Sequence, residues 1–174
     1  MPVRNIWALE PGECIVAEEI MKKLKDCEVY FPIRDVGVDL LVVKGNRHIG
    51  IQVKESRYYI SRTWKSGHRG HSWHQIKKAR FQMNKGKVDF YIFLTYLPVV
   101  GEHKISRFDN KFLIVPSSAL EKRMTIKDGG KKGIYSFCFH FESGKAWDER
   151  VTVSLENPLM NYTEFLDAWN LLDT

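Results

Sequence analysis

The sequence predicts a mixed α/β fold in which a central mixed β-sheet is flanked by helices. Helical and strand-like segments follow one another in the order α-β-β-β-α-β-β-α-β-β-α, which favours this architecture. The 174 residues are 44% hydrophobic and 28% charged, which is typical of a folded globular chain with one core. Neither an internal repeat nor a linker divides the sequence, so we expect residues 1–174 to form a single domain.

The first elements are predicted to be a helix and a hairpin. "EPGECIVAEEIMKKLKDC" has helical periodicity, with Pro11 near the start where proline is favoured. "VYFPI" follows as a short strand or extended link. Residues 38–43 and 48–54 then read as paired strands around "KGNR", in which Gly45 and Asn46 suit a two-residue turn.

The middle of the chain is predicted to hold a loop, a second helix and a buried strand. Residues 56–71 are expected to be a loop, because Gly67 and Gly70 interrupt any regular period. Ser72 is suited to cap a helix. The apolar stripe of that helix comprises Trp73, Ile76, Ala79 and Met83. "VDFYIFLTYL" is so apolar that we expect a strand covered on both faces.

The last third is predicted to add strands and two helices. "KFLIV" reads as a strand, "PSSALEKRM" as a short helix and "DGGKKG" as a turn. "IYSFCFHF" and "VTVSL" are further strands. "NYTEFLDAWNLL" is expected to be an amphipathic helix, because Asn161 and Glu164 are spaced like a capping box.

Composition indicates a cytoplasmic protein that does not enter membranes. The first residues contain no apolar stretch typical of a signal peptide. The longest apolar run, "FYIFLTYLPVV", is too short to span a bilayer. Cys14, Cys27 and Cys138 form no CxxC pair and leave an odd count, which favours a reducing compartment.

One basic block accounts for the net charge of +6. Between Ser56 and Val88 there are nine Lys and Arg residues and no Asp or Glu, as expected of a protein that binds a phosphate backbone. A solvated basic face or an acidic protein partner are the alternatives, and interleaved aromatic residues favour nucleic acid. The residues expected to contact nucleic acid are Arg57, Arg62, Lys65, Arg69, His71, Lys77, Lys78 and Arg80.

"HRGHSWH" raises a separate question about zinc. His68, His71 and His74 could be ligands, but a fourth ligand at the usual spacing is absent and glycine interrupts the segment. A loop that touches the DNA backbone is the favoured interpretation over a structural zinc site.

The mouth of the hairpin carries polar residues that a buried strand pair does not need. If Lys44 faces Arg47, then Asp39 faces Gln52 and Lys54 lies diagonally beside Asp39 on the same face. A structural ion pair between Asp39 and Lys54 would satisfy the buried carboxylate. A divalent cation held by carboxylate and amide oxygens would satisfy it equally well.

The first helix favours the metal-binding interpretation. At about 100° per residue, Glu13 falls on the apolar stripe of this helix, whereas Glu18 and Glu19 fall on its lysine-rich side. A favourable charge in the first helical turn is the structural alternative for Glu13. A Glu, an Asp, an amide and a Lys beside a basic block predict a metal-dependent phosphodiesterase site.

These segments also resemble a known family. "GECIVAEEI", "DVGVDLLVV" and "IQVKES", in this order and spacing, resemble the PD-(D/E)XK nuclease superfamily over about residues 12–95. The resemblance is to the branch with a Gln-x-Lys motif, which includes Mrr-type restriction endonucleases and small restriction-like proteins. It implies a restriction-endonuclease-like fold that binds Mg²⁺ or Mn²⁺ and cleaves duplex or branched DNA.

Position by position, Asp39 resembles the metal-binding acid and Lys54 the catalytic lysine, while Glu13 resembles the acid of the first helix. Gln52 stands where the family has a second acid, and Val38 replaces the proline of the motif. Because Gln52 removes a charge, a catalytically degenerate nucleic-acid-binding module stays open as the alternative.

The sequence therefore predicts a Mg²⁺-dependent DNA endonuclease. Glu13 and Asp39 are expected to hold the metal, assisted by Gln52 and the backbone carbonyl of Val53. Lys54 is expected to position or help activate the attacking water. The prediction leaves a homodimer open.

Overall fold

A central mixed sheet organises the computed structural model, which describes residues 9–34, 37–60, 70–100, 105–127, 133–149 and 156–173. The strands along the sheet, in spatial order, are β1 (Glu28–Tyr30), β2 (Leu40–Lys44), β3 (Arg47–Ile60), β6 (Phe90–Val100) and β7 (Ile105–Pro116). Only β3 and β6 pair in parallel along this order, and β4 (Gly70–Ser72) pairs with the far end of β3. The predicted mixed sheet is confirmed.

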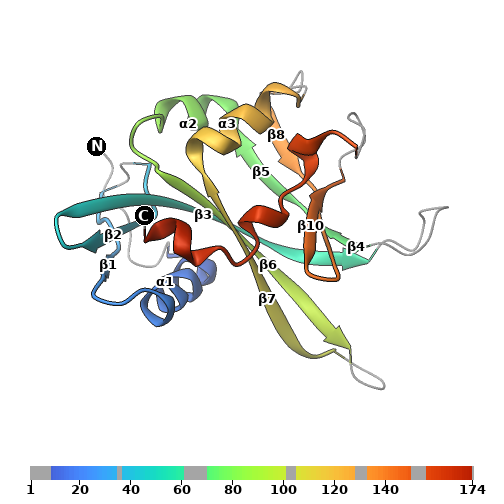
Figure 1. Ribbon diagram of the computed structural model, residues 1–174, viewed down its shortest axis with the longest axis horizontal. Coiled ribbons are helices and arrows are strands. Elements are labelled where there is room, and N and C mark those ends of the chain that lie inside the picture. The colour runs from blue at the N-terminus through green and yellow to red at the C-terminus, as the bar shows by residue number, and fades with distance from the viewer. Residues whose placement is uncertain are drawn as a thin grey trace.

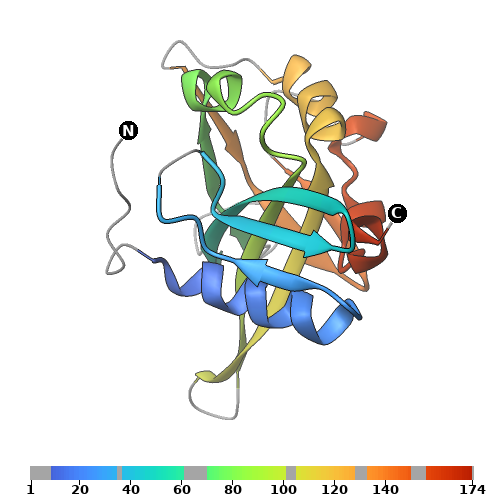
Figure 2. The same ribbon diagram turned by 90° about the vertical axis from the view of Figure 1, so that its left-hand side faces the viewer.

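Two layers cover the faces of this sheet. The helix α1 (Pro11–Lys23) lies against one face, while α2 (Lys78–Met83) and α3 (Ser117–Thr125) lie on the other side (Figures 1 and 2). Alternate residues of β6 enter different cores: Ile92 packs with the α1 layer and Phe93 with the opposite one. The prediction that this strand is covered on both faces is therefore confirmed.

Small strand pairs complete the layer of α2 and α3. They are β5 (His74–Lys77) with β8 (Ile134–Phe137), and β9 (Phe139–Glu142) with β10 (Lys145–Asp148). The chain then continues through three short 3₁₀ turns, η2 (Pro158–Met160), η3 (Thr163–Phe165) and η4 (Trp169–Leu172). A bridge between Leu113 and Leu166 places this last segment beside β7.

The prediction of a helix capped by Ser72 is wrong. The segment forms β4 and β5, in which Ser72, His74 and Ile76 are buried and the residues between them are exposed. This alternation with a period of two is that of a β-strand, and β5 pairs with β8. The helix α2 begins only at Lys78. Trp73, predicted on an apolar helical stripe, is instead 52% exposed.

The predicted loop over residues 56–71 is partly wrong, because β3 continues to Ile60 and β4 begins at Gly70. Residues 61–69, which include four of the predicted contact or ligand positions, lie outside the described part of the chain. Those four are Arg62, Lys65, His68 and Arg69. The predicted strand "VTVSL" and most of the predicted turn "DGGKKG" also lie outside it.

The predicted last helix is also wrong. The side chain of Asn161 accepts a hydrogen bond from the Thr163 N–H at 2.9 Å, which forms a short turn and not a helix cap. Glu164 does not reach back to Asn161 as in a capping box but pairs with Arg123 at 2.7 Å. Asp167 has a φ of 50°, so the chain cannot remain helical from η3 to η4.

None of the helices in the described ranges is long and apolar enough to cross a bilayer. Cys14, Cys27 and Cys138 form no disulfide bond in the described part of the chain.

Burial of one histidine makes the stability of the fold depend on pH. The imidazole of His74 lies between Phe93 and Phe139, at centroid distances of 5.3 and 5.5 Å, with Nε2 3.2 Å from the Thr95 hydroxyl. Burial, with a smaller contribution from the charge of Lys54, lowers the pKa of His74 to about 3. Its neutral form is therefore built into the core.

We expect acid to weaken the fold through this histidine. Between about pH 6.5 and 3, His74 binds a proton in the unfolded chain but stays neutral in the folded one. As the pH falls through this range, the free energy of unfolding should therefore decrease by up to about 1.4 kcal/mol per pH unit. Urea unfolding at several pH values measures this slope. His74→Phe should flatten it, whereas the exposed control His48→Gln should not; an unchanged slope in His74→Phe contradicts the assignment.

Candidate functional site

The hairpin has the register that the sequence predicts. The pairs run from Lys44 opposite Arg47 to Leu40 opposite Ile51, and the side chain of Gln52 contacts Asp39 at the mouth. The backbone N–H of Asp39 donates to the Ile51 carbonyl at 2.8 Å, so the chain is still held to β3 at this point.

Asp39 directly precedes β2, beside the part of β3 that extends past β2 and stays paired with β6. Its Oδ2 accepts a hydrogen bond from the Val53 N–H at 2.9 Å and another from the side-chain amide of Gln52. Because the N–H and C=O of one strand residue point to the same side, the carbonyl of Val53 faces this edge too. The structure therefore brings Asp39, Gln52 and Val53 together, with one carboxylate oxygen held by two donors.

Lys54 lines a cleft next to this edge. The cleft has a volume of about 390 Å³ and is bounded by Glu10, Lys54, Glu55, Tyr59, Trp73, His74 and Gln75. Trp73 is tied to the β3 edge by its backbone N–H, which donates to the Ser56 hydroxyl at 3.0 Å. The ammonium group thus meets a polar cleft with two half-exposed aromatic side chains, Tyr59 and Trp73, on its rim.

Glu13 lies on the buried face of α1, as its helical phase predicts. It is only 4% exposed and shares that face with Val16, Ala17 and Ile20. Glu18 instead pairs with Lys22 at 2.8 Å in solvent. Because α1 packs on the face that carries Ile51 and Val53, Glu13 belongs to the layer opposite the side chains of Gln52 and Lys54.

Sequence reasoning missed Glu55 and Gly12. An oxygen of Glu55 accepts a hydrogen bond from the Tyr96 hydroxyl at 2.6 Å. A Cβ built on Gly12 would clash with that same oxygen and come within 3.0 Å of the Glu55 Cβ, so the first turn of α1 packs closely on the Glu55 side chain. Two features of the sequence could have pointed to this contact. They are a glycine inside the first turn of the predicted helix and an acidic residue directly after Lys54.

The sequence analysis also missed Asn84, the residue that caps the C-terminal end of α2. Its side-chain amide donates to the Gly37 carbonyl at 2.9 Å and approaches the amide oxygen of Gln52 at 3.4 Å. These contacts join residues 32 and 47 positions apart, and no local pattern in the sequence marks them.

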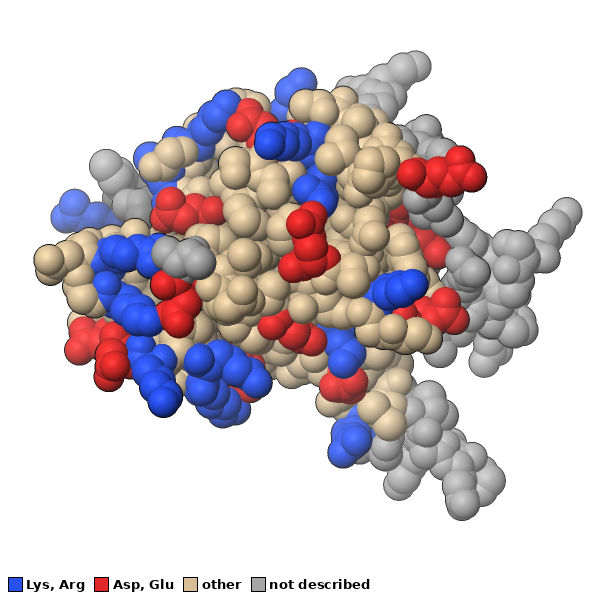
Figure 3. Space-filling view, viewed as in Figure 1, with Lys and Arg blue, Asp and Glu red and all other residues tan. Residues whose placement is uncertain are grey.

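The described part of the basic block is exposed. Arg57, Lys77, Lys78 and Arg80 are exposed, and His71 is partly exposed. Figure 3 shows Lys and Arg side chains gathered over α2 at the upper left, with a few acidic side chains among them. These basic side chains therefore lie at the surface of the described part of the molecule.

The residues present suit a hard divalent cation better than zinc. Among the described residues, no three His, Cys, Asp or Glu side chains are grouped so that they could hold a metal ion. The carboxylate of Asp39 and the carbonyl of Val53 would offer oxygen ligands, the kind that Mg²⁺ and Mn²⁺ prefer. His74, predicted as an alternative zinc ligand, is enclosed by aromatic rings.

Comparison with known proteins finds a structural relative but no sequence relative. No family model and no curated protein matches this sequence. The fold is similar to that of a bacterial homing endonuclease, I-Ssp6803I. The two structures align with a TM-score of 0.50 and 17% sequence identity, over 97% of this chain and 91% of that one. The shared fold is thus one that a nuclease uses, and the restriction-endonuclease-like class stays a prediction.

Replacing the helix acids separates their roles. We expect Glu13→Gln to lower the single-turnover cleavage rate at saturating Mg²⁺ by about a hundredfold, because the sequence prediction assigns this buried carboxylate to the metal site. Glu18→Gln removes the same charge from the solvent face of α1 and should change the rate little. Thermal melts check that both variants fold. A dead Glu18→Gln with an active Glu13→Gln would contradict the assignment.

Proposed function

We propose that this protein is a metal-dependent nuclease that cleaves DNA. The observation that supports the proposal is the hydrogen bond from the Val53 N–H to Asp39, with Lys54, the next residue of β3, lining a cleft. The resemblance of the same three segments to PD-(D/E)XK nucleases and the shared fold with a homing endonuclease support it. The exposed basic residues of β3, β5 and α2 supply the charge that a DNA backbone requires.

Asp39 and the carbonyl of Val53 would hold a Mg²⁺ or Mn²⁺ ion, with Glu13 as a further carboxylate. When bound, such an ion neutralises charge on the phosphate and lowers the pKa of water. Lys54 donates hydrogen bonds to the phosphate or to the attacking water and stabilises the negative charge that develops in the transition state. We assign Gln52 the role of a hydrogen-bond donor to Asp39, because its amide nitrogen faces that carboxylate.

The same contact favours one alternative function. Because Gln52 already satisfies Asp39 without a cation, a module that binds nucleic acid and does not cut is consistent with this site. Cleavage, and not binding, therefore discriminates between the two functions.

The test is an incubation of the protein with linear duplex, supercoiled, single-stranded and branched DNA and with RNA, each with Mg²⁺, Mn²⁺ or EDTA. We expect metal-dependent cleavage of duplex or branched DNA. Lys54→Met should lower the rate by about a hundredfold or more, whereas Lys145→Met, which removes the same charge from an exposed position outside the cleft, should not. Tight binding without cleavage under every condition would favour the binding module.

A further inference from the structure

The orientation of the Gln52 amide is decided outside the proposed site. Its side chain is 7% exposed, so its amide groups must find partners within the protein. A glutamine amide has a donor end and an acceptor end of nearly equal shape, and its neighbours decide which end faces where. One neighbour is Asp39 and the other is Asn84.

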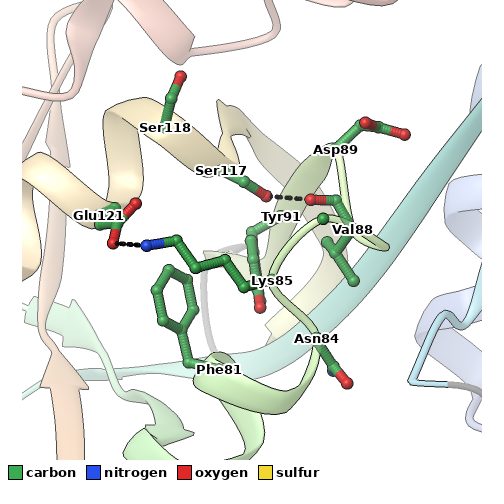
Figure 4. Close-up of a pocket in the computed structure, with 10 residues that line it drawn as sticks. Phe81, Asn84, Lys85, Val88, Asp89, Tyr91, Ser117, Ser118 and Glu121 are labelled. Carbon is green, nitrogen blue, oxygen red and sulfur yellow. Dashed lines mark hydrogen bonds and ion pairs between the residues drawn. The ribbon is translucent and has the colours of Figure 1, made fainter.

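Asn84 has a fixed orientation of its own. It is 3% exposed, and in Figure 4 its side chain points away from Lys85 and Glu121, whose ion pair spans the adjacent pocket. Its Nδ2 lies 2.9 Å from the carbonyl oxygen of Gly37, which can only accept a hydrogen bond. The amide nitrogen of Asn84 must therefore face Gly37.

This orientation passes to Gln52 and then to Asp39. The Nδ2 of Asn84 lies 3.4 Å from the nearest side-chain amide atom of Gln52. Because Nδ2 can only donate, that Gln52 atom must be the acceptor, Oε1. The amide nitrogen of Gln52 then faces Asp39 and donates to its Oδ2. Reversing Gln52 would place two N–H donors together at one end and a carbonyl oxygen against a carboxylate at the other.

The backbone around Gly37 is shaped to this contact. Gly37 has a φ of +85°, and a Cβ at this position would lie 2.0 Å from the Oδ1 of Asn84. Glycine is therefore required both for the backbone conformation and for the close approach of Asn84.

We propose that Asn84 is a positioning residue of the site. Through Gln52 it holds one oxygen of Asp39 in a hydrogen bond and so fixes the orientation of the carboxylate that would bind a cation. This inference rests on the proposed function for the role of Asp39, but the relay itself exists without metal. Residues that orient a metal ligand in this way affect metal affinity by about 10- to 100-fold.

The first arm of the test uses metal-free protein and does not depend on cleavage. Side-chain amide NMR signals of Gln52 should be protected from exchange with water in the wild type. They should lose protection in Asn84→Ala, and also in Asn84→Ser, whose hydroxyl is too short to span both acceptors. Ser117→Ala, which removes a hydrogen bond to Val88 in the same pocket, should keep the protection. Retained protection in both Asn84 variants would overturn the relay.

The second arm is a double-mutant cycle read by Mn²⁺ calorimetry. Asn84→Ala should weaken Mn²⁺ binding by about tenfold in the wild type but cause no further loss in Gln52→Met, because the relay is already absent there. An equal loss in both backgrounds means that Asn84 acts on structure alone and overturns the proposal. If Asp39→Asn binds Mn²⁺ like the wild type, the proposed metal site fails, while the NMR arm still decides the relay.

Discussion

Replacing Asp39 with asparagine is expected to abolish metal-dependent cleavage and to leave metal-free DNA binding intact. Asparagine retains an oxygen that can accept from the Val53 N–H and from Gln52, so the end of β2 should remain in place. It loses the negative charge and replaces the second oxygen with an NH₂ group, which cannot bind a cation. We expect the rate to fall by about a thousandfold, the upper range for loss of one electrostatic contributor.

Single-turnover cleavage and a DNA titration in EDTA measure the two parts of this expectation. Asp109→Asn is the matched control, because Asp109 is a half-exposed acid on β7 that pairs with Lys111 at 3.0 Å. Wild-type cleavage by Asp39→Asn would show that the catalytic carboxylate lies elsewhere. A parallel loss of DNA binding and of thermal stability would instead show that Asp39 acts on the fold.

Replacing Gln52 with glutamate is expected to lower the stability of the fold and to make that stability increase with divalent cation. The variant restores the acid of the family motif, but it exchanges a donor to Asp39 for a second carboxylate in a buried position. Two carboxylates in contact raise the pKa of one of them by two units or so, which corresponds to about 3 kcal/mol of lost stability above that pKa. For a chain of 174 residues this is a fall of roughly 5–10 °C in Tm without metal.

The sign of the pH effect follows from the raised pKa. The folded variant holds its extra proton to higher pH than the unfolded chain does, so its stability relative to the wild type should be lost as pH rises through the folded pKa. Mg²⁺ or Mn²⁺ should restore the Tm by neutralising the pair. Thermal melts at pH 5 and pH 8, each with EDTA or Mg²⁺, provide the measurement. A Gln52→Glu variant as stable as the wild type at pH 8 in EDTA would contradict the contact between the two side chains.

Local patterns in the sequence determined the hairpin and the phase of the first helix. The Gly45-Asn46 turn and the alternation of strand residues are enough to predict the register from Lys44 opposite Arg47 to Leu40 opposite Ile51, because each depends on neighbours within a few residues. Helical periodicity likewise separates the buried Glu13 from the exposed Glu18, since it depends on angle alone.

Tertiary pairing decided the segments that local preference misjudged. His74–Lys77 forms a strand because its backbone pairs with β8, about 60 residues later in the chain. The final segment does not form a helix for two reasons. Glu164 pairs with Arg123 and so does not form the predicted capping box, and Asp167 has a positive φ that interrupts the helix. In each case a distant contact outweighed a propensity of a few tenths of a kcal/mol per residue.

The surroundings of the candidate site also came only from the tertiary structure. Glu55 meets the first turn of α1 only because Gly12 packs against β3, and Asn84 meets Gln52 only because the end of α2 lies beside Gly37. A linear sequence shows which residues carry an acid or an amide, but hydrogen-bond direction depends on which groups the folded chain brings within about 3 Å. The residue types proposed for the chemistry were therefore readable from the sequence, whereas the orientation of Gln52 toward Asp39 was decided by the fold.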